Sequence, residues 1–358
     1  MLQKLLWPFW NKNEKRPRAL WRMGLHLFVW SFLADIFQMG LIIVFTALLS
    51  GLKGNSTDFP GSGQPIEVFS NSWINFVILP VGTCLAILLA TFLIGKWVDR
   101  RTFREFGFHF SKKWWLDFGF GLVLSAVLMG GIFLFGLLTG TMKLTGYFQS
   151  YLEDVHFSLG LVQFLILFVQ VGIYEEVLSR GYYFVNLAEG LNLSLIGKRN
   201  ALILTWLITS IVFGVLHLSN PNATWISTSM IMVAGLFLGL GMVLTGSLAI
   251  PIGLHIAWNF FQGNLFGFPV SGMQTGVSVF VTESTGPEWL TGGAFGPEAG
   301  VMGLAAMVIG SVLTLLWISR KTPLSLKEDL AVYQPAARGI NHKEKIDQRE
   351  IDNPSDPL

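Results

Sequence analysis

The sequence has very little cysteine and little charge, and each deficit excludes a class of protein. Its 358 residues include a single cysteine, Cys84, so an internal disulfide, a cysteine-rich zinc site and a thiol pair are all excluded. Charged residues make up only 13%, and the formal net charge of +2 is too small to indicate a nucleic-acid partner. We therefore expect no nucleic-acid binding, and we expect Cys84 to be a small packing residue in its apolar run.

The sequence is instead rich in long apolar stretches. Hydrophobic residues make up 52% of the chain and form about eight stretches, each long enough to cross a hydrocarbon core of about 30 Å as a helix. Lipid offers the backbone no hydrogen-bond partner, and no alternating pattern indicates a barrel. We predict an all-α polytopic transmembrane helix bundle, with spans near 23–50, 74–95, 116–139, 160–187, 201–217, 225–247, 249–267 and 299–318.

The distribution of basic residues predicts the orientation. They cluster before the first span, after the second, and after the fourth and eighth, whereas the loop at 268–298 has three glutamates and no lysine or arginine. By the positive-inside rule both termini are cytoplasmic, and we expect a multi-pass protein of the plasma membrane. The first apolar run lacks a small-residue cleavage site, so we expect the first span to be retained.

Composition divides the chain into three parts. Residues 1–22 are predicted as a basic cytoplasmic segment, 23–319 as the transmembrane bundle and 320–358 as a charged, disordered cytoplasmic tail. The segments 53–72 and 268–298 are rich in glycine, serine, threonine and proline, which predicts external loops. We find no internal repeat and no independent soluble domain.

Three short motifs place polar side chains inside these apolar stretches. They are EEVLSR at 175–180, FGVLH at 213–217 and HIAWN at 255–259. A charge at the centre of a membrane helix costs about 2.5 to 3.5 kcal/mol, so several together need a reason. Each motif alone is compatible with helix packing, but together they supply a carboxylate, two imidazoles and an amide. Those groups can activate water and stabilise an oxyanion.

Helical spacing gives the two glutamates different roles. Neighbouring residues point about 100° apart on a helix, so Glu175 and Glu176 cannot face the same way. Arg180 lies one turn after Glu176 in the order that favours an ion pair. Pairing would neutralise Glu176 and leave Glu175 to face an interior cavity as a general base. The same one-turn spacing relates Phe213 to His217 and His255 to Asn259.

The three motifs in this order resemble the signature of the CAAX-protease and bacteriocin-processing (CPBP) family of intramembrane glutamic endopeptidases. The match covers about 160–267 and is complete at Glu175, Glu176, Arg180, Phe213, His217, His255 and Asn259. The resemblance implies that Glu175 and His217 activate water. It implies that His255 and Asn259 stabilise the oxyanion, with Glu176, Arg180 and Phe213 in structural support. It further implies no cofactor and a peptide or protein substrate that reaches the membrane, lipidated in some family members.

Two alternatives stay open. A carboxylate and two histidines can hold catalytic zinc with water as the fourth ligand, although the chain has no HExxH motif. The same polar side chains can also serve packing alone, in a non-enzymatic membrane scaffold or immunity protein. A transporter has less support, because no inverted repeat is present.

The predicted spans raise a conflict of depth. They put Glu175 in the middle of the membrane, His217 near the outer end of its helix and His255 toward the inner face. A common site therefore requires that the fifth helix continue past Leu218, or that helices be tilted or broken around a cavity. We predict that Glu175, His217, His255 and Asn259 line one cavity.

Overall fold

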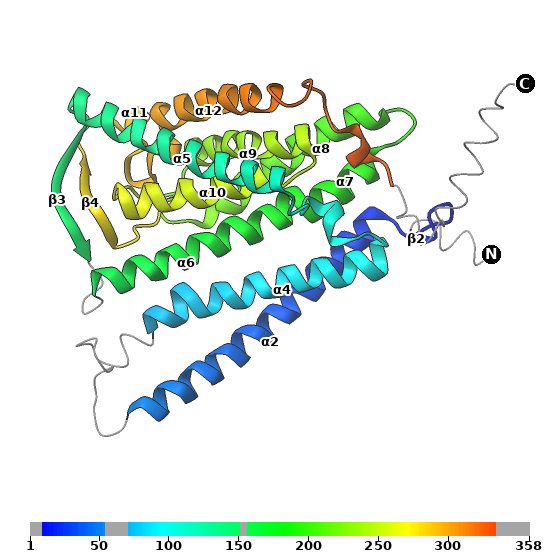
Figure 1. The fold of residues 1–358 in the computed structure, drawn as a ribbon, viewed down its shortest axis with the longest axis horizontal. Helices are drawn as coiled ribbons and strands as arrows, with labels where there is room; N and C mark the ends of the chain where they lie inside the picture. The colour runs from blue at the N-terminus through cyan, green and yellow to red at the C-terminus, as the bar shows by residue number, and fades with distance from the viewer. Residues whose placement is uncertain (1–8, 54–70, 151–155, 334–358) are drawn as a thin grey trace, which may run out of the picture.

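The computed structural model describes residues 9–53, 71–150 and 156–333, which form a bundle of long helices (Figure 1). Among these residues, seven helical segments are long and apolar enough to cross a membrane. Their bounds are Ala19–Gly51, Asn71–Asp99, Lys112–Thr139, Phe157–Leu191, Gly197–Ser219, Trp225–Thr245 and Val301–Ser319. The prediction of an all-α polytopic membrane protein is confirmed.

The long helices follow one another along the chain, and several contain a π-helical turn. The helices are α2 (Ala19–Lys53), α4 (Leu79–Ile94), α5 (Lys112–Thr139), α6 (Phe157–Glu176), α7 (Tyr183–Leu191), α8 (Gly197–Leu216), α9 (Trp225–Thr245), α10 (Ala249–Phe260) and α12 (Val301–Ser319). The π-helical turns are η1 (Ile74–Ile78), η2 (Gly95–Asp99), η4 (Val177–Tyr182) and η6 (Phe261–Leu265). Because η4 joins α6 to α7 without a break, the fourth span is one continuous helix.

The centre of the bundle is α10, which packs against α5, α6 and α9. Residues Ala249 to Asn259 are all buried. A helix that is apolar on every side belongs in a core, and α10 with η6 is shorter than the roughly 20 residues that a span needs. The seventh predicted stretch, 249–267, therefore forms this core helix, which is packed between α5, α6 and α9.

Small residues allow the helices around α10 to approach closely. Gly121 of α5 and Gly253 of α10 each lie against the backbone of the other's helix with no room for a Cβ. Beside them, Ser125 Oγ donates a hydrogen bond to Leu254 O at 2.7 Å. Membrane helices associate through such close contacts and hydroxyl bonds, because lipid removes the hydrophobic driving force between them. This contact fixes the position of His255, the next residue of α10.

A two-stranded sheet lies at one end of the bundle (Figure 1). Strand β3 (Met142–Ser150) pairs antiparallel with β4 (Val277–Ser284), with Met142 opposite Ser284. The loop predicted at 268–298 thus contains a strand and a short helix, α11 (Glu288–Thr291). The difference arises because the partner strand follows α5, far away in the sequence. We call β3, β4 and residues 266–300 the cap.

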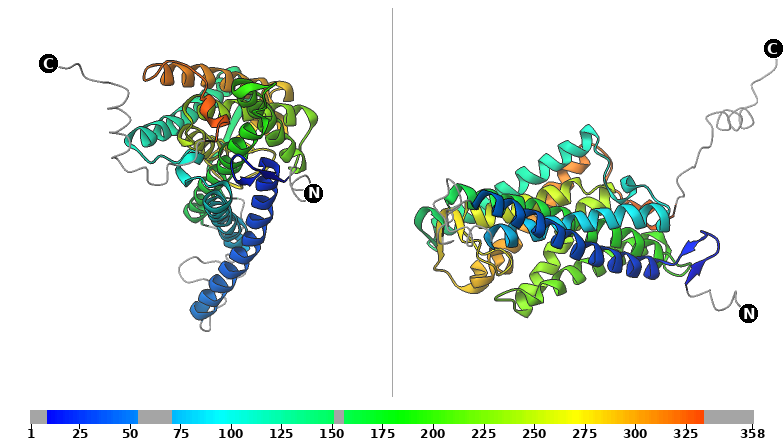
Figure 2. Two further views of the ribbon diagram at one scale, coloured as in Figure 1. Left: turned by 90° about the vertical axis from the view of Figure 1, so that its right-hand side faces the viewer. Right: turned by 90° about the horizontal axis from the view of Figure 1, so that it is seen from below.

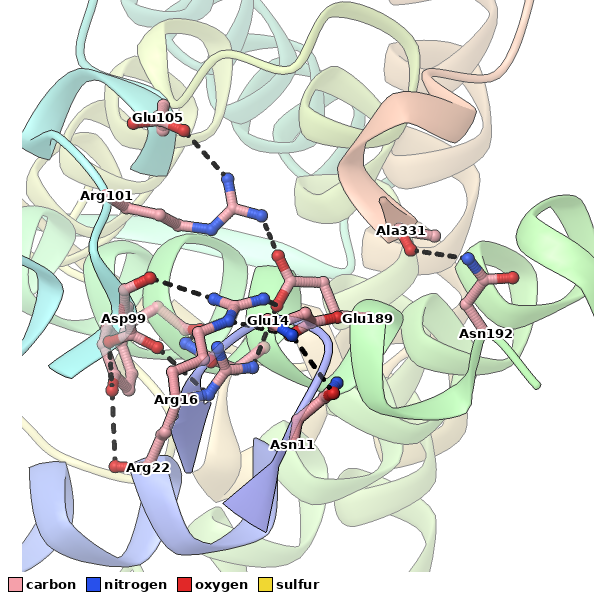
Figure 3. Close-up of polar contacts among 12 residues, drawn as sticks. Asn11, Glu14, Arg16, Arg22, Asp99, Arg101, Glu105, Glu189, Asn192 and Ala331 are labelled. Atoms are coloured by element: carbon pink, nitrogen blue, oxygen red, sulfur yellow. Dashed lines mark hydrogen bonds and ion pairs between the residues drawn. The ribbon is translucent and has the colours of Figure 1, made fainter. Parts of the chain in front are cut away.

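At the opposite end of the bundle, buried ion pairs connect elements that are far apart in the sequence (Figure 3). Glu189, near the end of α7, binds Arg16 at 2.8 Å and Arg22 at 2.9 Å, and it also contacts Arg101. Arg22 in turn lies 3.3 Å from Asp99 at the end of η2. The hairpin of β1 (Trp10–Asn11) and β2 (Arg16–Pro17) also lies at this end, away from the cap (Figure 2). The basic segment before the first span and the basic loop after the second therefore meet at this end.

Part of the predicted tail packs on this charged end. The 3-10 turn η9 (Glu328–Ala331) contacts α7 and α8, and Ala331 is buried. Asn192 Nδ2 donates to Ala331 O at 2.9 Å, which anchors the turn. The prediction of a disordered tail stays a prediction for residues 334–358. They lie outside the described residues, as does most of the external loop predicted at 53–72.

Candidate functional site

The first motif lies where α6 passes into the π-helical turn η4. Glu175 and Glu176 are the last two residues of α6, and Arg180 lies in η4. The predicted ion pair is confirmed, with Arg180 Nη1 at 2.8 Å from Glu176 Oε1 and both side chains buried. Arg180 Nη2 also donates to Gly235 O of α9 at 3.2 Å. Single π-helical turns inside α-helices are frequent at functional sites.

His255 connects the third motif to the first. Its Nδ1 lies 2.8 Å from Glu176 Oε1, and its Nε2 lies 3.8 Å from Glu175 Oε2. Because a carboxylate only accepts, Nδ1 carries the proton and Glu176 fixes the orientation of the ring. Glu176 Oε1 therefore accepts from both Arg180 and His255. The contact with His255 was not predicted, since helical spacing relates Glu176 only to residues of its own helix.

Phe213 brings the second motif to the same place. The Arg180 guanidinium lies 4.2 Å from the centroid of the Phe213 ring. That centroid is 4.8 Å from the ring of His217 and 6.1 Å from the ring of His255. His217 Nδ1 lies 2.7 Å from Phe213 O. A carbonyl only accepts, so in the neutral imidazole of His217 the proton is on Nδ1 and Nε2 is an acceptor.

The conflict of depth is resolved by the position of α8. The helix continues past its last α-helical residue as the 3-10 turn η5 (His217–Ser219). Its contacts with α7 and η9 place it toward the charged end of the bundle. Phe213, on the last turn of α8, is therefore level with Arg180 and His255. The predicted limits of the span were nearly right, and the packing of α8 brings Phe213 and His217 beside the other two motifs without an α-helix that continues past Leu218.

Three of the four predicted catalytic residues line one cavity of about 40 Å³, which we call the central cavity. They are His217, His255 and Asn259. Such a volume admits water but not a peptide chain. Glu175 does not line it: its side chain is 25% exposed, and its Oε2 lies 3.8 Å from Nε2 of His255, which does line the cavity. The expectation that all four line the cavity fails for Glu175, because Glu176 takes the inward position next to Arg180.

A buried carboxyl from the cap also lines the central cavity. Glu298 is 3% exposed and accepts hydrogen bonds from Gln262 Nε2 and from both the N–H and the hydroxyl of Ser271. Burial raises the pKa of Glu298 to about 7, and the hydrogen bonds oppose that shift in part. Sequence reasoning missed this residue because a glutamate before a span reads as solvated. The one signal in the sequence was that Glu298 lies in the glycine- and proline-rich run GPEAG, which is typical of a tight turn.

Zinc was the alternative that the motifs left open for these polar groups. Within the described residues, no group of three or more His, Cys, Asp and Glu side chains could hold a metal ion. The Nδ1 atoms of His217 and His255 are bonded to Phe213 O and Glu176. Each imidazole therefore has only Nε2 left for another partner.

The central part of the chain matches a known protein family. Residues 157–261 match the family model described as "Type II CAAX prenyl endopeptidase Rce1-like". The match runs from the first residue of α6 to just past the end of α10, and it contains all three motifs. The family resemblance drawn from the motifs is thereby confirmed for this segment. No curated protein and no solved structure matches the chain.

Proposed function

We propose that the protein is an intramembrane endopeptidase that hydrolyses a peptide bond with a water molecule activated by glutamate and histidine. The match to an endopeptidase family supports the reaction class. The observation that carries the mechanism is the meeting of the three motifs from separate helices. Glu176 Oε1 contacts both Arg180 and His255, and Phe213 lies beside Arg180 and His217.

Water activation is assigned to Glu175 and His217. Glu175 Oε2 is a buried oxygen without a hydrogen bond to any described residue. His217 lines the central cavity and keeps Nε2 as an acceptor. A water held by both groups gives its proton to Glu175, and its oxygen attacks the scissile carbonyl carbon. The π electrons of the carbonyl then move onto the carbonyl oxygen, which becomes the oxyanion.

Stabilisation of the oxyanion is assigned to His255 and Asn259. Both line the central cavity. Because Nδ1–H of His255 is bonded to Glu176, His255 can donate from Nε2 only as the imidazolium, so this assignment requires the ring to carry both protons. When the intermediate collapses, the C–N bond breaks. The leaving amine takes the proton that Glu175 received from the water. Glu176 and Arg180 act as positioning residues in this scheme.

Removing the Asn259 amide tests the oxyanion assignment. We expect Asn259→Ala to lower kcat for peptide cleavage about 10²- to 10³-fold with little change in KM, because the lost hydrogen bond forms only in the transition state. Steady-state kinetics in lipid nanodiscs measures both constants. Asn186→Ala is the matched control, since Asn186 is also buried but bonds Tyr182 O outside the cavity. A loss confined to KM would contradict the assignment.

We further propose that the reaction needs no metal, against the zinc alternative. A site without a metal is favoured because Nδ1 of His217 and of His255 already has a hydrogen-bond partner and because Glu176 is paired with Arg180. We expect the purified protein to contain less than stoichiometric zinc and to keep its cleavage rate in a strong chelator. Elemental analysis and the rate with and without chelator test this. Stoichiometric zinc whose removal abolishes cleavage, with recovery on adding zinc back, would establish the alternative.

A non-enzymatic scaffold or immunity role is the second candidate. The observation that favours it is the size of the central cavity, about 40 Å³, which admits no peptide as the molecule stands. In that case the contacts among the motifs would serve packing alone. The Glu175→Gln comparison described in the Discussion distinguishes the two functions.

The apolar surroundings of the site support a lipidated substrate. A cavity of about 670 Å³ between α4, α5, α6 and α10 is lined only by apolar side chains, including Phe92, Trp114 and Phe118. Ile173 and Ile256, which also line it, lie two residues before Glu175 and directly after His255. We propose that this cavity takes the lipid chain of a peptide or protein substrate. We also propose a plasma-membrane location, cytoplasmic termini and no nucleic-acid partner.

A further inference from the structure

The cap contains a second large cavity, distinct from the central one. Its volume is about 750 Å³, within the usual range of ligand sites. We call it the cap cavity. Its lining comes from β4, from the loop before that strand and from the segment around α11, and it is rich in glycine, serine and threonine. Such a lining exposes backbone and hydroxyl groups, which suit an extended peptide better than a lipid chain.

Only a thin partition separates the cap cavity from the central cavity. Pro269 and Pro297 line the cap cavity, whereas Ser271 and Glu298, one or two residues further along, line the central cavity. The two segments Pro269–Ser271 and Pro297–Glu298 therefore form a wall with one cavity on each side. We call these two segments the wall.

Glu298 holds the two segments of the wall together. Its carboxyl accepts from Ser271 in the other segment and from Gln262, and Gln262 Nε2 also donates to Pro269 O at 2.6 Å. Because Gln262 follows α10 in η6, these bonds tie the wall to the helix that carries His255 and Asn259. No other charged residue of the cap lines the central cavity.

We propose that the cap cavity binds the peptide part of the substrate, and that Glu298 positions the wall through which the peptide reaches the central cavity. This inference rests on the proposed peptidase function and explains how a cavity too small for a peptide receives one. The occupant is an extended peptide segment with positive charge. Glu283 and Glu288 line the cap cavity, and no lysine or arginine among the described residues does. Lys143 lies opposite Glu283 on β3 but is not part of the lining.

The wall is expected to open more readily as pH rises. Burial raises the pKa of Glu298 to about 7 from an ordinary value of 4.5, which it regains when opening exposes it to water. The closed wall therefore binds the proton more tightly, and the stability that this gives is lost between pH 4.5 and 7. From pH 6 to 8 this linkage increases opening about tenfold. The titratable groups on neighbouring elements are Glu288 of α11, His217 of η5 and His255 of α10; α9 and α12 carry none.

Peptide binding to inactive protein tests the cap cavity. The protein is full-length Glu175→Gln in phosphatidylcholine nanodiscs, and the probes are two fluorescent ten-residue peptides in which threonine alternates with lysine or with glutamate. We expect the lysine peptide to bind about tenfold more tightly, a difference that corresponds to 1.4 kcal/mol. Glu283→Gln with Glu288→Gln should remove the preference, whereas Glu328→Gln at the charged end should retain it. No binding, or a preference unchanged by the double substitution, overturns the assignment of the cap cavity.

Hydrogen exchange of residues 267–276 tests the wall without relying on activity. After correction for intrinsic exchange, we expect protection in the unsubstituted protein to fall about tenfold from pH 6 to 8. Glu298→Gln mimics the neutral acid and should remove this dependence, while Ser271→Ala, which keeps the backbone donor, should preserve it. Protection that is the same at both pH values in the unsubstituted protein overturns the role of Glu298. If binding and exchange behave as expected but no peptide is cleaved, the proposed peptidase function fails and the cap site stands.

Discussion

Glu175→Gln is expected to slow peptide cleavage about 10²- to 10⁴-fold while the protein stays folded and inserted in the membrane. Glutamine keeps the size and polarity of glutamate but cannot take a proton from water. Glu175 Oε2 has no hydrogen bond to a described residue, and Glu175 forms no ion pair with a described arginine or lysine, so folding loses little by the change. The measurement is the single-turnover rate with a cleaved peptide, beside the unfolding temperature in the same detergent.

Two further variants sharpen that comparison. Glu105→Gln is the control, because it removes a carboxylate that pairs with Arg101 and lies outside the three motifs. Glu175→Asp keeps the base but withdraws it by one methylene, so its rate should fall between those of the other two. A normal rate for Glu175→Gln would exclude Glu175 as the general base and would favour the other polar groups of the cavity.

Arg180→Met is expected to destabilise the protein by about 3 to 5 kcal/mol, the largest stability effect that we predict. It leaves the Glu176 carboxylate buried without its ion-pair partner and removes the cation beside the Phe213 ring. Denaturant unfolding in mild detergent measures the free energy. Adding Glu176→Gln should recover most of the loss, since the second substitution removes the uncompensated charge.

The matched control for Arg180 is an ion pair at the surface. Lys198 lies 3.2 Å from Glu328, and the lysine is 53% exposed. Lys198→Met should change the free energy of unfolding by less than about 1 kcal/mol, because water screens exposed pairs. Equal effects of the two substitutions would show that the buried pair contributes no more to stability than a surface contact.

The helices could be predicted from the sequence because length and hydropathy are local properties. The seven membrane-length segments correspond to predicted spans, and the Glu176–Arg180 ion pair followed from one-turn spacing. The cap could not be predicted in the same way. Strands β3 and β4 pair only with each other, across more than a hundred intervening residues, so neither could be placed from its own stretch of sequence.

The composition of the site was predictable, but its arrangement was not. The motifs identified Glu175, His217, His255 and Asn259 as candidates. Which glutamate touches His255 depends on how α6 packs against α10, and helical spacing does not contain that information. Glu298 was even less predictable, since only the folded cap shows that this carboxyl is buried beside the central cavity.

The central claim is that this protein cuts peptide bonds by means of Glu175. Its most direct test works for a substrate of any sequence. Membranes containing the unsubstituted protein or Glu175→Gln at equal abundance are compared by mass spectrometry for newly formed peptide termini. We predict a set of termini that appears with the unsubstituted protein and is absent with Glu175→Gln, and the masses of the peptides will show whether the substrates carry a lipid. Identical termini in the two membranes would contradict the claim.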